Sequence, residues 1–223
     1  MTQKGLDSSQ YGIWINTHDI SIDTYTHLLY EQFVLGTPAY DLSKKGRDLL
    51  SFYHCDDIRD YEILYKDLSL DSLDCSFSET CEDLKREILQ HSWLGFKDLP
   101  SDVAEAVYIY VGDYKDSTLY KAGFSHLPKI DNKLPNEQRA AEKQRRKKVA
   151  CIDKMFAHLR NSMAHGRFNI LDAEEDRYYI FQDEYHGLVS ARMILRQRTL
   201  DQWIQVLKKM EFTTHEEAAT LIS

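Results

Sequence analysis

The sequence lacks any run of about 18 apolar residues, the minimum length of a typical membrane-spanning helix. Residues 1–10 also lack the apolar stretch of a secretory signal. These absences exclude a transmembrane helix and predict a cytoplasmic protein that does not engage a membrane. The chain shows no internal repeat and no low-complexity segment, so we expect folded domains along its length.

Cysteine is scarce, and none of the 4 cysteines belongs to a Cys-x-x-Cys pair. Pairs of that spacing supply the ligands of many structural zinc sites. A cytosolic chain also keeps its thiols reduced. We therefore expect reduced, structural cysteines, no metal site and no other cofactor.

Basic residues are outnumbered, because 28 lysines and arginines face 36 acidic residues and leave a net charge of −8. Such a balance argues against non-specific binding of nucleic acid. One segment departs from it: residues 139–148 hold only one acidic residue, Glu142, beside the basic residues Arg139, Lys143, Arg145, Arg146, Lys147 and Lys148. Two interpretations stay open, a solvated helix face and a guide for an RNA backbone, and the second makes these six residues candidate RNA-binding residues.

The longest helical pattern of the chain runs from Asn136 to His165. Its apolar stripe comprises Val149, Ile152, Met155, Leu159 and Met163. Gly166 follows directly and predicts the end of the helix, which leaves His165 on the last turn.

The last turns of this predicted helix carry Arg160, Asn161 and His165. Histidine has a pKa near neutrality and suits proton transfer, whereas the planar guanidinium of arginine suits phosphate. Asn161 and His165 share a helix face, but Arg160 lies about 140° around the helix axis from His165. One helix therefore cannot aim both groups at one phosphate, and we expect a homodimer whose two copies meet through this helix.

The order Arg160-Asn161, three residues, then His165-Gly166 resembles the Arg-x4-His motif of the HEPN superfamily, whose full name is higher eukaryotes and prokaryotes nucleotide-binding domain. The resemblance implies a helical bundle that dimerises through the motif helices. It also implies a metal-independent endoribonuclease of the kind found in toxin–antitoxin and anti-phage systems, with RNA as substrate and an antitoxin or regulatory protein as a further partner. The implied active-site set is Arg160, Asn161 and His165.

The predicted reaction is attack of a ribose 2′-hydroxyl on its own phosphodiester, which yields a 2′,3′-cyclic phosphate. His165 would move the proton, Arg160 would bind the phosphate, and Asn161 would orient His165 or hold the phosphate. His158 lies on a similar face of the helix, where a packed or exposed bystander is the favoured interpretation over a supporting role.

The pattern on both sides of this helix predicts a mainly α fold, and the resemblance implies that residues 57–223 form a HEPN-like helical bundle. Apolar spacing predicts helices over 78–93 and 101–112 and a closing helix from Thr199. A small β-hairpin is predicted over 178–195, with its turn at 185–187.

Residues 1–56 are predicted to form a small N-terminal lobe. A helix from residue 23 to 34 is followed by a break, by a short strand at Tyr40 and Leu42, and by a second helix that begins after Ser43 and buries Leu49, Leu50 and Tyr53. This strand and the helix after it resemble the last wing strand and the following helix of winged-helix regulators. Two alternatives to an endoribonuclease therefore remain. One is a non-catalytic HEPN-like module that binds RNA, nucleotide or protein, and the other is a winged-helix DNA-binding regulator.

Overall fold

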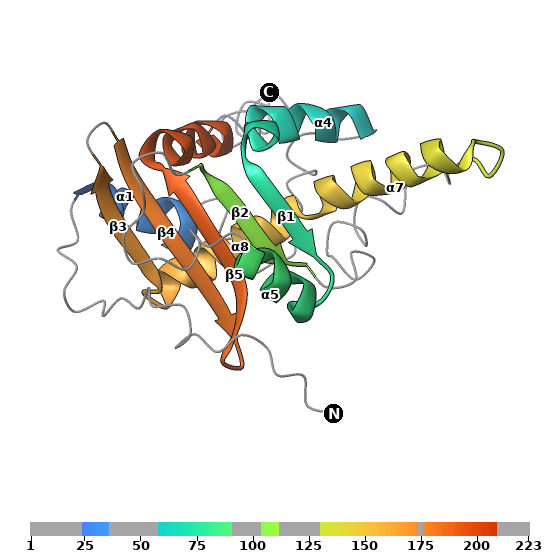
Figure 1. The fold of residues 1–223 in the computed structure, drawn as a ribbon. Helices are drawn as coiled ribbons and strands as arrows, with labels where there is room; N and C mark the ends of the chain where they lie inside the picture. Colours follow the sequence, from blue (N-terminus) through green and yellow to red (C-terminus); the bar gives the residue numbers. More distant parts are fainter. Residues whose placement is uncertain (1–23, 36–57, 91–103, 112–129, 174–175, 209–223) are drawn as a thin grey trace, which may run out of the picture.

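The protein forms a five-stranded mixed sheet with helices on both faces (Figure 1). The structure is a computed structural model that describes residues 24–35, 58–90, 104–111, 130–173 and 176–208. The strands are β1 (Asp74–Ser78), β2 (Ala106–Tyr110), β3 (Phe168–Ala173), β4 (Asp176–Tyr185) and β5 (Leu188–Arg196), in the order β1-β2-β5-β4-β3. The α-helices are α1 (Thr24–Tyr30), α4 (Ile58–Asp67), α5 (Cys81–Gln90), α7 (Asn136–Ala150), α8 (Ile152–Ala164) and a last helix over residues 197–208. Two shorter helices are the π-helix η3 (Glu31–Leu35) and the 3₁₀-helix η4 (Leu70–Ser72).

The prediction of a mainly α, HEPN-like helical bundle is wrong, because the sheet is the centre of this fold. Within the helix predicted over 101–112, residues 106–110 form the strand β2 instead. Residues 106–109 are all buried, since helices cover both faces of this strand. A strand buried on both faces is apolar throughout, and its hydrophobic pattern cannot be told from that of a buried helix.

A parallel βαβ unit, β1–α5–β2, builds one edge of the sheet. Thr80 caps α5: its Oγ1 accepts a hydrogen bond from the backbone N–H of Asp83 at 3.0 Å and donates one to the Asp83 carboxylate at 2.7 Å. The predicted helix is thus present, but it begins after Thr80 and not at residue 78. Its buried residues Leu84 and Ile88 cover one face of the sheet.

The larger core lies on the opposite face, where α8 packs beneath the sheet beside η3 and the last helix. The predicted stripe of α8 is buried there, and Phe156 adds ring contacts to Phe33 at 6.2 Å and Trp203 at 5.6 Å. The single helix predicted over 136–165 is divided into α7 and α8 at Cys151.

Residues 24–35 belong to this same core, because Leu29 and Phe33 are fully buried in it. The helix predicted from residue 23 to 34 is therefore present as α1 and η3. The predicted strand at Tyr40 and Leu42, the helix predicted after it and the boundary between residues 56 and 57 lie outside the described residues. The winged-helix hypothesis and the two-domain division therefore stay predictions.

The β4–β5 hairpin confirms the predicted one, with its turn at His186 and Gly187 at φ values of 50° and 77°. Positive φ at both turn residues is typical of a type I′ turn. A β-bulge interrupts the pairing, since Asp183 pairs with Ala191 but Glu184 pairs with Val189, and Ser190 is the extra residue. None of the described helices is both long and apolar enough to cross a membrane.

Candidate functional site

A cavity of about 440 Å³ opens at the end of the sheet where β2 and β4 finish and β5 begins. One wall is α8, which presents Lys154, His158, Asn161 and His165 to the cavity. These residues follow one another at intervals of three or four positions and so form one stripe along the helix. The strands supply the facing wall, including the acidic residue Asp183.

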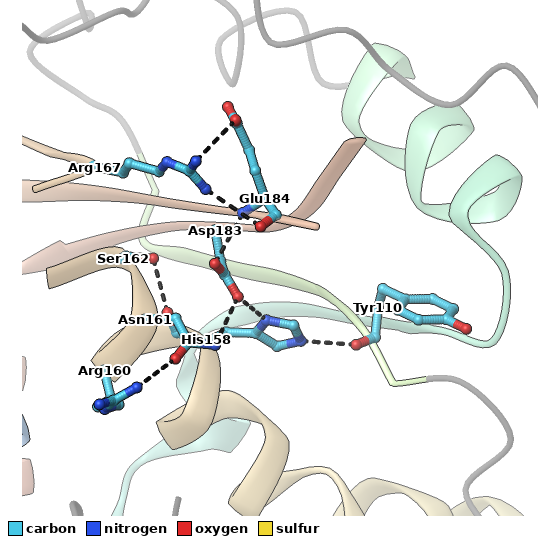
Figure 2. Close-up of polar contacts among 8 residues, drawn as sticks. All are labelled: Tyr110, His158, Arg160, Asn161, Ser162, Arg167, Asp183 and Glu184. Carbon is cyan, nitrogen blue, oxygen red and sulfur yellow. Dashed lines mark hydrogen bonds and ion pairs between the residues drawn. The ribbon is translucent and has the colours of Figure 1, made fainter. Parts of the chain in front are cut away.

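His158 is held at both ring nitrogens. Figure 2 shows its imidazole between the Asp183 carboxylate and the backbone carbonyl of Tyr110. The distances are 2.8 Å from Nδ1 to Asp183 Oδ2 and 2.9 Å from Nε2 to the Tyr110 oxygen. A carbonyl oxygen only accepts, so Nε2 donates to Tyr110, and Nδ1 faces the carboxylate of Asp183.

This histidine therefore joins three elements, α8, β2 and β4, and is packed, not exposed. The side chains of His158 and Asp183 are 12% and 7% exposed, so the ion pair is largely buried. Since both ring nitrogens are engaged within the fold, neither is open to a ligand.

Asn161 and Arg160 extend this network. Arg160 Nη1 donates to Asn161 Oδ1 at 3.0 Å, and Asn161 Nδ2 donates to Asp183 Oδ2 at 3.3 Å (Figure 2). Asn161 lines the cavity, whereas Arg160 is not among the described residues that do so. Asn161 thus links the arginine to the buried carboxylate, and it does so with both ends of its amide group.

His165 lies at the end of α8, where the chain turns away in a Schellman motif. The N–H of Gly166 bonds the Met163 carbonyl at 3.0 Å, and the N–H of Arg167 bonds the Ser162 carbonyl at 2.7 Å. Gly166 has a φ of 62°, which explains why a glycine stands there, and the predicted helix stop is confirmed.

The ring of His165 is exposed and lines the cavity. It makes no hydrogen bond with any residue that the structure describes. Among the predicted site residues, His165 is therefore the one whose imidazole is open to a ligand.

The basic segment lies on α7, which extends from α8 beyond the edge of the sheet (Figure 1). Lys143 is exposed there, and Arg139 donates a hydrogen bond to the side-chain oxygen of Asn136. Arg145, Arg146, Lys147 and Lys148 belong to the same helix, but their side chains lie outside the described ones. The described part of α7 contributes nothing to the cavity lining.

Several cavity residues were missed from the sequence, above all Asp183, Tyr185 and Ser190. One signal was available, because Asp183 is an acidic residue close to the apolar run 178–181 of its strand. Another cavity residue, Cys81, is a poor candidate nucleophile, since burial raises the pKa of its thiol and keeps it protonated. No group of three or more metal-binding side chains occurs within the described ranges.

Comparison with protein-family models, with curated proteins and with solved structures gives no match. The resemblance to the HEPN motif therefore remains a prediction that rests on Arg160, Asn161 and His165. Any assignment of function has to come from the cavity itself.

Proposed function

We propose that the cavity is the active site of a metal-independent endoribonuclease. One observation carries this proposal: the exposed imidazole of His165 opens onto a cavity whose wall is a polar stripe of the same helix. Lys154 lies at the other end of that stripe, about 16 Å away along the helix axis, and brings positive charge to the cavity. An imidazole beside a helix stripe that carries a lysine and polar side chains suits a phosphodiester substrate.

In the proposed reaction, His165 accepts the proton of a ribose 2′-hydroxyl, and that oxygen attacks the adjacent phosphorus. The bond from phosphorus to the 5′-oxygen breaks, and the imidazolium returns the proton to the departing oxygen. The products are a 2′,3′-cyclic phosphate and a 5′-hydroxyl. The clamp formed by Asp183, His158 and the Tyr110 carbonyl keeps the wall beside His165 in place. The deciding test compares RNA cleavage by the wild type and by His165→Ala in the presence of a chelator.

The role of Arg160 requires a second copy of the chain. Within one chain it bonds Asn161 and is absent from the described cavity lining, so it does not share a cavity with His165. We therefore propose a homodimer in which Arg160 of the partner subunit reaches the phosphate held near His165. Asn161, whose amide already bonds Arg160 and Asp183, then acts as a positioning residue.

Complementation between two inactive variants tests this arrangement. Arg160→Ala and His165→Ala chains, each with a different tag, are co-expressed and the mixed dimer is isolated through both tags. The mixed dimer should regain about half of the wild-type activity, because one of its two sites combines an intact arginine with an intact histidine. Each homodimer of a single variant serves as the inactive control. A mixed dimer without activity, or a wild type that is monomeric by light scattering at micromolar concentration, would contradict the shared site.

The basic segment gives a separate prediction. If it guides the RNA backbone, replacement of Arg145, Arg146, Lys147 and Lys148 with glutamine should weaken RNA binding. It should also flatten the plot of log affinity against log salt by about 0.7 for each phosphate that the variant no longer neutralises. The matched control removes four charges elsewhere, at Lys66, Lys85, Arg86 and Lys133. A salt slope that is equal in the wild type and the segment variant would identify a solvated helix face.

One observation favours a second candidate, a non-catalytic module that binds RNA or a nucleotide. His158 and Asn161 are both fixed by hydrogen bonds, which leaves His165 as the one open imidazole of the described cavity. A protein that binds RNA in the presence of a chelator but never cleaves it would belong to this class.

The proposed nuclease also implies a partner. A nuclease that needs no metal would have to be restrained in the cell, which fits a toxin–antitoxin or anti-phage role with an antitoxin or regulatory protein as partner.

A further inference from the structure

Two cavity residues have no part in the mechanism proposed above, and both indicate that the cavity binds a ligand. Ser190 is 3% exposed, and its hydroxyl has no hydrogen-bond partner among the residues that the structure describes. Tyr185 is the opposite case, since it is 70% exposed although it is a large aromatic residue. Both residues line the same cavity, Ser190 as a buried group and Tyr185 as an exposed one.

The β-bulge explains why the hydroxyl of Ser190 has no partner in the strand pairing. In a regular strand Val189 and Ala191 would face the same side of the sheet. Here Val189 packs in the core under α5, whereas Ala191 packs in the core under α8. The extra residue between them is Ser190, whose side chain lines the cavity. Bulges beside functional sites often change the direction of a side chain in this way.

A buried hydroxyl without a partner is unfavourable, because it has lost its hydrogen bonds to water and gained none in return. Native proteins therefore pair nearly all such groups with protein, water or ligand. Since Ser190 faces a cavity of a size that holds small molecules, a polar group of a ligand is the natural partner for its hydroxyl.

Tyr185 indicates the chemistry of that ligand. Its ring lies beside the hairpin turn, and the imidazole of His186 packs edge-on against it with the ring centroids 4.2 Å apart. An exposed aromatic ring held at the edge of a cavity is a common platform on which an unpaired nucleobase stacks. A nucleobase also carries the donors and acceptors that a serine hydroxyl can bond at its edge.

We propose that this cavity receives one unpaired nucleobase, which stacks on Tyr185 and hydrogen-bonds Ser190. Ser190 is then a specificity-determining residue, and Tyr185 is a stacking residue that accepts any base. The inference rests on the proposed function for the identity of the polymer, a single-stranded RNA, but the base pocket itself does not depend on cleavage. A free nucleotide offers the same chemistry, so the experiment must separate the two sources.

Binding is measured by fluorescence anisotropy with short 2′-O-methyl oligonucleotides, which cannot be cleaved by attack of the 2′-oxygen. The probes are oligo(A), oligo(C), oligo(U) and an abasic strand of equal length, with free mononucleotides as competitors. The wild type should prefer one base and bind the abasic strand most weakly. Competition by mononucleotides at concentrations comparable to those of the oligomer would assign the pocket to free nucleotides, and its absence would assign it to single-stranded RNA.

The variants separate the two contacts. Ser190→Ala should weaken binding of the preferred base about three- to tenfold, the usual effect of one neutral hydrogen bond, and leave the abasic strand unaffected. Tyr185→Ala should weaken all base-containing strands about 5- to 100-fold because the stacking is removed, whereas Tyr185→Phe should bind like the wild type. Ile63→Ala, at an exposed apolar residue of α4 outside the cavity lining, is the control.

The melting temperature of each variant shows whether weaker binding comes from a destabilised fold and not from the lost contact. Ser190→Ala should not lower it, because the hydroxyl that it removes bonds none of the described residues. The inference is overturned if the wild type binds the abasic strand as tightly as the others, or if Ser190→Ala keeps the full base preference. If either result is obtained and the wild type still cleaves RNA, the base pocket is ruled out but the nuclease is not. If the wild type binds one base selectively but does not cleave RNA, the nuclease is ruled out but the base pocket is not.

Discussion

The purified protein is expected to cleave single-stranded RNA in the presence of a chelator, and His165→Ala is expected to lower the rate about 10²–10⁴-fold. That factor is the usual contribution of a positioned acid–base group. The expectation rests on an exposed imidazole that lines the cavity at the end of α8. Arg160→Ala should reduce the rate by a comparable factor, because the proposed partner arginine would no longer stabilise charge on the phosphate.

Folding should survive the loss of His165, since its ring is exposed and bonds none of the described residues. Circular dichroism of the variant should therefore match that of the wild type. His27→Ala removes another exposed histidine, one that pairs with Glu31 on the first helical segment, and should cleave normally. Cleavage that requires added magnesium, or a His165→Ala variant as active as the wild type, would rule out the mechanism.

The second large effect concerns stability. His158→Ala is expected to lower the free energy of unfolding by about 3–5 kcal/mol, the range for removing one partner of a buried ion pair. The Asp183 carboxylate would stay buried with Asn161 Nδ2 and the Glu184 N–H as its remaining bonds. The Tyr110 carbonyl would also lose the bond that it accepts from His158. Urea unfolding followed by circular dichroism measures the change.

Arg86→Ala provides the comparison, because it removes one partner of an exposed ion pair with Asp83. It should change the free energy of unfolding by less than about 1 kcal/mol. A double-mutant cycle between His158→Ala and Asp183→Ala should show that the two effects do not add, since the residues are in direct contact. An effect of His158→Ala as small as that of Arg86→Ala would show that this pair does not hold α8 to the sheet.

Part of the fold could be read from local sequence. The apolar stripe of the helix ending at Ala164, the glycine that stops it and the β4–β5 hairpin were all predicted, because each depends on residues close together in the chain. The sheet was missed for a different reason. β2 is buried on both faces and so loses the alternation that marks a strand, and its neighbours β1 and β5 come from distant parts of the chain.

The candidate site also has features that follow from local sequence and features that do not. The sequence by itself determined that Asn161 and His165 share a helix face and that Arg160 points elsewhere, since helical geometry alone sets those directions. Only the tertiary structure decided that His158 is clamped by Asp183 and that Ser190 lines the cavity. The first depends on how α8 lies against β4, and the second on a shift in strand register. Neither follows from local pattern, because both arise where segments that are separate in the chain pack together.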